Sequence, residues 1–467
     1  MAVEHHRERE VTFDVDDDWT VPDLSALASS GGRVETATHE LAATYLDTER
    51  STLRLLGMTL RHREGGADAG WHLKIPAGNA RTEVQSRAAA GSLPEALRRR
   101  VSGVVGDDPV RPVATIRTTR RTTRLVDKDG DVVVEVADDR VTGTAAGADA
   151  YPVAWREVEV ELGPAGQEDD LERVTSLFTG ARPAAVERKI THVLGEPPRT
   201  VPEGLPGLVV ADLRDQCAAI LLGDVGMRDD PKPDVVHATR VGLRRLRSTL
   251  RLFDHVVAGV PDAMDDHLAW LAGLLSPIRD ADILGRRLEA ELDELETPDV
   301  LGPVRAELEA ELKSVREAAV MAWREAWGDP RYRGIMATLV RWYAAVPVGD
   351  DVAVRPRRTL RKARRKVRRR LARGTDAHGL HQARKAVKRL RYAGDLLEPA
   401  LPRARHVAKN AKDLQTTLGE HQDLIVASAF VRGLATSGRV ENAFTYGVLA
   451  DRFDHQAMAI RSSVLGG

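Results

Sequence analysis

The chain has 467 residues, of which 42% are hydrophobic, enough for two or three domains with real cores. The formal net charge is only −1 at pH 7, and this balance alone argues against a protein that binds polyanions. The signs are segregated, however, because arginines crowd the C-terminal half while acids gather at residues 14–18 and 289–311. Electrostatic potentials act locally, so a cationic surface is compatible with a neutral total.

Features of secreted or membrane proteins are missing from the sequence. The single cysteine, Cys217, excludes an intrachain disulfide, and no stretch approaches 18 consecutive apolar residues. The first residues contain no apolar segment of the signal-peptide type. We therefore expect a cytoplasmic protein that has no membrane partner.

Residues 3–194 show a period-two pattern, which predicts β-strands. The clearest alternating runs are 115–126, 132–139 and 156–162. Glycine-containing pairs such as Asp129-Gly130 and Gly163-Pro164 separate the runs and predict turns.

Like charges share one face of several predicted strands. They are Glu8 and Glu10 on the first, Arg61 and Arg63 on another, and Glu157, Glu159 and Glu161 on a late one. Neighbouring like charges repel, but acids can gather around a divalent cation and arginines around phosphates. Two interpretations follow: a barrel with a charged interior for a metal–polyphosphate ligand, or the solvent faces of an ordinary sheet.

The order of these motifs resembles the CYTH domain, the triphosphate tunnel metalloenzyme family. The matching motifs are Glu8-x-Glu10, Tyr45-x-Asp47-Thr48, Leu60-Arg61-x-Arg63, Leu73-Lys74, and a late Glu-x-Glu strand followed by Lys189. The resemblance implies an α+β chain whose first domain, residues 3–194, is an eight-stranded antiparallel tunnel barrel. It also implies binding or hydrolysis of triphosphate compounds with Mg²⁺ or Mn²⁺.

The resemblance also implies roles for individual residues. The metal ligands would be Glu8, Glu10, Glu157, Glu159 and Glu161, and the phosphate-binding cations would be Arg61, Arg63, Lys74, Arg120 and Lys189. Catalysis would rest on Glu8, Glu10, Arg61, Arg63, Lys74 and Lys189, with Glu135 and Asp139 as further tunnel residues. The family motif is Glu-x-Glu-x-Lys, whereas Thr12 stands at the lysine position here. Hydrolysis and binding without hydrolysis therefore both remain open.

Residues 195–206 are rich in proline and glycine and predict a linker. From residue 207 to the end the period becomes 3.6, which predicts an all-α domain. Among the expected helices are 208–223, 262–274, 279–298, 402–417 and 421–435.

Two of the expected helices repeat one pattern of basic residues. His237 is followed three, seven and ten positions later by Arg240, Arg244 and Arg247, and His381 is followed at the same spacing by Arg384, Lys388 and Arg391. These steps lie within about 80° of one another on a helix. Asp280 and Asp423 follow at matching distances, which indicates an internal duplication with repeats at about 208–345 and 356–467. We expect two pseudo-symmetric helical bundles whose basic stripes meet across a cleft.

The histidine-headed stripes resemble the CHAD domain, the conserved histidine α-helical domain. The resemblance covers residues 207–467 and implies binding of inorganic polyphosphate and targeting to polyphosphate granules. Arg251 extends the first stripe, and Arg361 and Arg365, from the acid-free block 355–373, are further candidates for polyphosphate binding. The two histidines either orient an arginine or donate to phosphate.

Three functions compete at this point. The first is a polyphosphate-binding protein with a metal-dependent triphosphatase tunnel, and the second is a non-catalytic module for polyphosphate sensing or granule targeting. The third is nucleic-acid binding through the arginine-rich helices. Aromatic residues make up only 4% of the chain and are nearly absent from the stripes, which disfavours base stacking and hence the third function.

Overall fold

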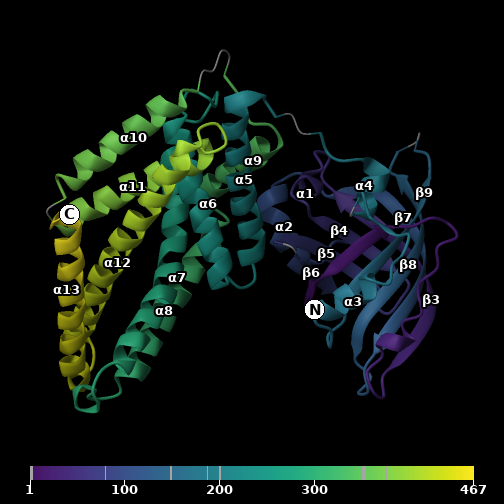
Figure 1. Cartoon of the computed structure of the whole chain (residues 1–467), viewed down its shortest axis with the longest axis horizontal. Helices are drawn as coiled ribbons and strands as arrows, with labels where there is room; N and C mark the ends of the chain where they lie inside the picture. Colours follow the sequence, from purple (N-terminus) through teal and green to yellow (C-terminus); the bar gives the residue numbers. More distant parts are fainter. Residues whose placement is uncertain are drawn as a thin grey trace. The chain divides into compact units, whose positions relative to one another are not determined.

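The computed structural model describes residues 4–78, 80–147, 150–186, 188–198, 201–349, 354–374 and 376–466, with the backbone alone for 4–8 and 466. The chain divides into two compact units, Met1–Arg199 and Thr200–Gly467. The first is built on a β-sheet and the second is helical (Figure 1).

One antiparallel sheet forms the first unit. Over the described residues it has ten strands in the order β1-β6-β5-β4-β3-β7-β8-β9-β2-β10. The strands are β1 Glu4–Glu8, β2 Glu10–Asp14, β3 Arg33–Asp47, β4 Thr59–Glu64, β5 Gly70–Ala77, β6 Ala80–Ser86, β7 Arg111–Val126, β8 Val132–Ala145, β9 Val153–Leu162 and β10 Arg182–Pro183. The short helices are η1 Ser25–Leu27, α1 Thr52–Leu55, α2 Glu95–Val105, α3 Glu168–Thr175 and α4 Lys189–Leu194.

The expected eight strands become ten for two reasons. The first expected strand is interrupted at Arg9, which separates β1 from β2, and β10 adds a two-residue strand. β1 pairs with β6 and β2 pairs with β9, at opposite ends of the strand order. One continuous segment therefore brings the two ends of the sheet together, as a tunnel requires, although the hydrogen-bonded ladder itself is not a closed ring.

The outer face of the sheet is apolar where α3 covers β8 and β9. Val134, Val136, Val158 and Val160 are fully buried and pack with Leu171, Val174 and Phe178, in α3 and the residues after it. Successive side chains of a strand point to opposite faces. The charged residues at alternating positions, such as Glu157 and Glu159, therefore point to the inner face.

Helix α4 contributes an apolar layer at one end of the inner face. Its Ile190 packs with Tyr45, Ile116 and Val141, whose strand positions share the inner face with the charged residues. This packing fixes α4 and carries its first residue, Lys189, to the charged part of the tunnel.

The second unit consists of nine α-helices over the described residues. They are α5 Gly204–Met227, α6 Pro233–Leu252, α7 Met264–Asp293, α8 Val304–Ala326, α9 Pro330–Ala344, α10 Pro356–Leu371, α11 Ala377–Leu397, α12 Arg403–Ser437 and α13 Ala443–Gly466, with 3₁₀ turns η2 Thr297–Asp299 and η3 Val440–Asn442. Each of α5 to α8 packs on the next, and α10 to α13 do the same. The duplication is thus visible as two runs of four helices, with α9 added after the first.

Three helix boundaries differ from the expectation. The helices expected at 262–274 and 279–298 are the single helix α7, because Leu275 and Ile278 on either side of Pro277 both remain in the buried stripe. The helices expected at 402–417 and 421–435 are likewise the single helix α12. α5 begins at Gly204, inside the expected linker, because a proline in the first turn, here Pro206, sacrifices no helical hydrogen bond.

The two runs of helices share one core, which α7 and α8 form together with α12 and α13. Leu284, Leu288 and Leu308 from α7 and α8 pack with Leu424 and Phe453 from α12 and α13. Within the described part of the chain, every helix is too short or too polar to cross a lipid bilayer.

Candidate functional site

A cavity of about 310 Å³ lies on the inner face of the sheet. It is lined by residues from β2 to β9 and from α4, so the whole tunnel contributes. Nine of the predicted tunnel residues line it: Glu10, Arg61, Arg63, Lys74, Arg120, Glu135, Glu159, Glu161 and Lys189. The alternation that suggested two interpretations therefore belongs to an interior face and not to a solvent face.

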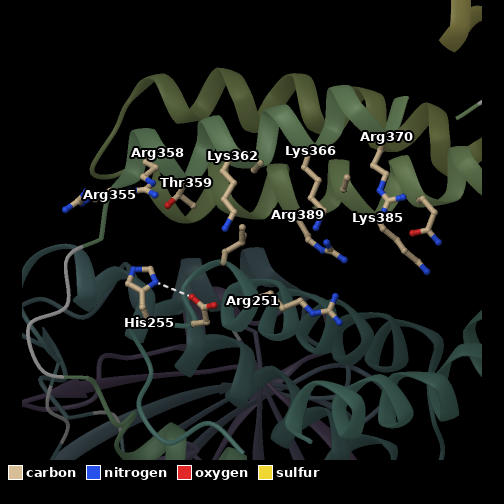
Figure 2. A pocket seen from close by; sticks show the side chains of 15 residues that line it. Arg251, His255, Arg355, Arg358, Thr359, Lys362, Lys366, Arg370, Lys385 and Arg389 are labelled. Carbon is tan, nitrogen blue, oxygen red and sulfur yellow. Dashed lines mark hydrogen bonds and ion pairs between the residues drawn. The ribbon is translucent and has the colours of Figure 1, made fainter. Parts of the chain in front are cut away.

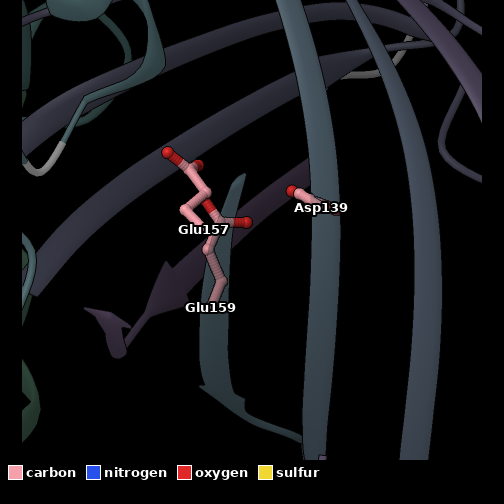
Figure 3. A group of neighbouring side chains, drawn as sticks. All are labelled: Asp139, Glu157 and Glu159. Atoms are coloured by element: carbon pink, nitrogen blue, oxygen red, sulfur yellow. The ribbon is translucent and has the colours of Figure 1, made fainter. Parts of the chain in front are cut away.

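The acidic corner of the tunnel comes from two adjacent strands. Asp139 on β8 lies opposite Glu157 on β9, and Glu159 follows on the same face. Carboxylate oxygens of these three residues lie within 4.8 Å of one another (Figure 3). Asp139 and Glu157 are almost completely buried, so the three carboxylates need cations nearby.

Lys189 supplies one of those cations. Its Nζ lies 2.6 Å from Glu159 and 3.0 Å from Asp139, and it also donates to Glu157. Burial alone would lower the pKa of Lys189, but the three carboxylates outweigh burial and raise it. Lys189 was predicted to hold phosphate, whereas here its ammonium is centred on the acids. A phosphate role remains a prediction.

The protonation of the two glutamates differs. Burial raises the pKa of Glu157 despite its pairing with Lys189. Burial also acts to raise the pKa of Glu159, but Lys189 and Arg120 outweigh it and hold that pKa well below its ordinary range. Arg120 donates to Glu159 at 2.5 Å and to Asp139 at 2.6 Å, so it connects the acidic corner to the cationic wall.

The cationic wall is carried by β4 to β6. Arg61 donates to the hydroxyl of Tyr45 at 3.2 Å, and Arg63 forms an ion pair with Asp68 in the turn after β4. Burial, with the nearby charge of Arg61, lowers the pKa of Arg63. Two arginines thus lie side by side in the tunnel, a pattern that favours an anionic ligand.

The predicted metal ligands separate into two places. Glu10 forms ion pairs with Arg81 at 2.6 Å and with Lys74 at 3.7 Å, and lies opposite Glu161 in the strand register. The cluster with ligand geometry is instead Asp139, Glu157 and Glu159. The side chain of Glu8 lies outside the described residues, although its backbone pairs with Arg81.

The carboxylates of the tunnel fit a divalent ion chemically. Mg²⁺ and Mn²⁺ prefer oxygen donors, and Asp139, Glu157 and Glu159 can offer one each at short mutual distance. The ammonium of Lys189 already neutralises these oxygens, so an ion at this corner must share them with Lys189 or displace it.

Some tunnel residues gave no clear signal in the sequence. His72 is buried and contacts Glu83 at 3.0 Å and the backbone oxygen of Asp68 at 2.7 Å. Glu83 and Arg81 alternate along β6 and could have been found by their period of two. Asp68 could not, because a turn residue returns to the tunnel only through the three-dimensional path of the chain.

Parts of the two basic stripes lie close together, where α6 and α11 contact each other. Arg240 and Arg244 on α6 and Arg384 on α11 lie close enough to Lys388 on α11 for their charges to act on it. Burial, together with these three arginines, lowers the pKa of Lys388 to about 7. We call Arg240, Arg244, Arg384 and Lys388 the interhelix cluster.

The remaining stripe residues pair with acids, on α7 for the first stripe and on α11 itself for the second. Arg247 and Arg251 pair with Asp265, and Arg391 lies 3.7 Å from Asp395. Within the interhelix cluster itself, Arg240 donates to Asp280 at 2.9 Å. The i,i+4 spacing of Arg391 and Asp395 is visible in the sequence, whereas the partners Asp265 and Asp280 on α7 are not.

The two histidines begin their stripes in similar surroundings. Nδ1 of His381 lies 3.0 Å from Gln422 Oε1. Burial and the adjacent cations lower the pKa of both His237 and His381. Arg361 lines a different groove, together with Arg357 and Arg364, and Arg365 is exposed on α10.

Comparison with known proteins agrees with this architecture. The family model of the CYTH domain matches residues 6–190, and that of the CHAD domain matches residues 211–432. Uncharacterized protein MT2285 of Mycobacterium tuberculosis is 34% identical over 484 residues, which cover 95% of this chain and 92% of that protein.

Two solved structures are similar to part of this chain. The CHAD domain from the plant Ricinus communis is 27% identical, with a TM-score of 0.45, and the match covers 57% of this chain and 94% of that one. PptA from Streptomyces chartreusis is 20% identical, with a TM-score of 0.47, and the match covers 56% of this chain and 98% of that one. From the two domain matches and the full-length relative, the chain belongs to the family of proteins that join a CYTH domain to a CHAD domain.

Proposed function

We propose that the tunnel binds the triphosphate group of inorganic triphosphate or a related compound and hydrolyses it with Mg²⁺ or Mn²⁺. The observation that carries this proposal is one cavity in which Arg61, Arg63 and Lys74 face the carboxylates of Glu159 and Glu161. In a triphosphate–metal complex, the cationic side chains of the cavity can bind the phosphates and its carboxylates can bind the metal ion.

The tunnel residues have two proposed roles, phosphate binding and metal binding. Four cations neutralise charge on the phosphate oxygens and orient the triphosphate for in-line attack by water. They are Arg61, Arg63, Lys74 and Arg120. Glu159, Asp139 and Glu157 would hold the divalent ion, with Glu8, Glu10 and Glu161 as the further ligands that the family motif implies. When bound, the ion supplies Lewis-acid stabilisation of the phosphate charge.

The helical unit is proposed to bind inorganic polyphosphate. The interhelix cluster concentrates four cations between α6 and α11, with His237 and His381 at the same ends of their helices. Arg247, Arg251 and Arg391 would contribute after exchanging their acidic partners for phosphate, and Arg361 and Arg365 remain predictions. Such binding would place the protein at polyphosphate granules in the cytoplasm.

The second candidate function is binding of a phosphate chain in the tunnel without hydrolysis. Thr12 brings no charge to the tunnel, and Lys189 already neutralises the acidic corner. With these features the tunnel would sense or retain a phosphate chain without cleaving it.

Phosphate release separates the two candidates. The full chain is incubated with inorganic triphosphate and either Mg²⁺ or Mn²⁺, beside Glu159→Gln and the exposed control Glu172→Gln on α3. A hydrolase predicts release by the wild type and by the control, with a loss of about 10²-fold or more for Glu159→Gln. If the wild type releases no phosphate but still binds triphosphate, the sensing candidate replaces the hydrolase.

A further inference from the structure

A second cationic groove lies beside the interhelix cluster. It has a volume of about 810 Å³ and is enclosed by α10, α11 and the C-terminal end of α6 (Figure 2). Most of its lining side chains are arginine or lysine, and Asp254 is the one acid among the described residues that line it. We call it the α10 groove.

Helix α10 carries the longest row of these cations. Arg358, Lys362, Lys366 and Arg370 are spaced four residues apart, so they form one row of about 18 Å along the helix. In Figure 2 Lys362, Lys366 and Arg370 extend from α10 into the groove on the side of Arg251 and Arg389, and Arg358 lies beside Arg355 at the end near His255. The row is held in place because Leu360, Ala363 and Val367 are buried, and because α10 packs on α11.

The positive charge of the groove is poorly compensated. Within the described parts of the chain, Lys362, Lys366 and Lys385 have no acidic group at ion-pair distance. Partial burial and the charges of Arg389 and Arg370 lower the pKa of Lys366, and burial and Arg251 lower that of Arg389. The cations therefore repel one another until an anion enters.

The corresponding helix of the other repeat has no such cationic row over its described residues. The helix before the first stripe is α5, which is the counterpart of α10, and it carries Asp212 and Asp215 in place of a cationic row. Burial raises the pKa of both aspartates, and the charge of Arg245 on α6 only partly offsets this effect. Arg245 itself pairs with Asp395 at 2.9 Å. Charge is thus balanced on the α5 side and unbalanced on the α10 side.

The α10 groove is continuous with the interhelix cluster. Arg389 in the groove lies close enough to Arg247 of the first stripe for the charge of Arg247 to lower its pKa. On α11, Lys385 of the groove acts in the same way on His381 of the second stripe. On α11 the groove residues Lys385 and Arg389 directly follow the cluster residues Arg384 and Lys388, so a linear anion can pass from one set of cations to the other. Asp265 lies beside this path, where it already pairs with Arg247 and Arg251.

We propose that the α10 groove is a second polyanion subsite, which binds a further stretch of the same linear phosphate chain that occupies the interhelix cluster. This inference rests on the proposed function of the helical unit and adds that high affinity requires a chain longer than triphosphate. Among the described residues of the groove there is no Phe, Tyr or Trp, and His255 is the one ring, so a row of stacked bases has little support. A bare phosphate chain fits better than a nucleic acid.

The test compares two triple variants of the full chain with the wild type. Arg358→Gln/Lys362→Gln/Lys366→Gln removes three cations from the groove. Arg357→Gln/Arg364→Gln/Arg368→Gln removes three from the opposite flank of α10, with the same loss of charge on the same helix. Affinity for long-chain polyphosphate is measured at several salt concentrations, and circular dichroism confirms that both variants retain their helices.

We expect the groove variant to lose affinity at least tenfold more than the flank variant. The slope of log K against log salt should become shallower by about 2, since each phosphate contact contributes about 0.7 for a single-stranded polyanion. Affinity for inorganic triphosphate should stay unchanged.

Three results would be decisive against parts of this picture. Equal losses in the two variants would overturn the groove and leave the helical unit as a polyphosphate binder. Displacement of polyphosphate by single-stranded DNA at equal phosphate concentration would overturn the ligand class. If the wild type itself does not bind long-chain polyphosphate at physiological salt, the proposed function of the helical unit fails.

Discussion

Thr12 on β2 lies directly opposite Glu159 on β9, on the charged inner face of the sheet. The family motif places a lysine at this position, so a cation is missing beside the acidic corner. The register also shows that Thr12 faces the tunnel, where a longer side chain could reach the ligand.

Restoring the lysine should therefore strengthen phosphate binding. Thr12→Lys is expected to bind inorganic triphosphate about tenfold more tightly, because one hydrogen bond to a charged group contributes about 1.5–3 kcal/mol. Calorimetric titration measures the affinity, and Thr12→Met adds similar length without charge. If both variants bind equally, the missing charge at position 12 has no role.

Removing Lys189 should destabilise the tunnel. Lys189→Met leaves Asp139, Glu157 and Glu159 without their shared cation, and an uncompensated buried charge costs about 3 kcal/mol or more. Hydrogen exchange of the β8 and β9 amides reports on this unit alone. The control Lys128→Met breaks an exposed pair with Asp129 and should cost less than about 1 kcal/mol.

The effect of Lys189→Met should depend on pH and on metal. In the wild type the pKa of Glu159 is depressed, so its ion pairs stabilise the fold at neutral pH, and this stability is lost as pH falls through the folded-state pKa. The difference between wild type and variant should thus shrink in acid, and Mn²⁺ should partly restore the variant at pH 7. A difference that is constant with pH and unaffected by Mn²⁺ would contradict the charge-based explanation.

Polyphosphate binding should weaken as pH rises through the range around 7. The pKa of Lys388 is about 7 in the free protein, and a polyanion favours its protonated form. His237 and His381 titrate at lower pH, since burial and adjacent cations lower their pKa, and Asp423 faces Lys388 as an acid. Binding near neutral pH should therefore take up a fraction of a proton.

Calorimetry in buffers of different ionisation enthalpy measures that uptake. Lys388→Arg stays charged and should bind tightly at every pH between 6 and 9, whereas Lys388→Gln should bind weakly throughout. A wild-type pH profile that persists in both variants would assign the titration to another group.

Much of the tunnel could be predicted because a strand has a strict period of two. Because Glu157, Glu159 and Glu161 share one face of a strand, all three must lie either inside the tunnel or outside it. The sequence could not show that Lys189 would be centred on the acids, nor that Asp68 would pair with Arg63. Both contacts depend on how a helix and a turn return to the sheet, which no local pattern records.

In the helical unit, too, some features could be predicted from the sequence and others could not. The duplication predicted that the two basic stripes would meet, and the charges of Arg240, Arg244 and Arg384 do lie close enough to Lys388 to lower its pKa. The partners Asp265 and Asp280 lie on α7 and were invisible in the stripes themselves. The continuity of α7 through Pro277 was also missed, because proline is a strong local stop signal that tertiary packing overrides here.

Triphosphate titration of the full chain tests most directly whether the inner face of the sheet is a phosphate site. Arg61→Gln/Arg63→Gln is compared with Arg117→Gln/Arg121→Gln, which removes two exposed arginines of β7, and hydrogen exchange of β4 and β5 confirms that both variants are folded. We predict that the control binds like the wild type and that the tunnel variant loses about 100-fold, from two charged contacts of about 1.5 kcal/mol each. A tunnel variant that is folded and binds triphosphate as tightly as the control would contradict the assignment.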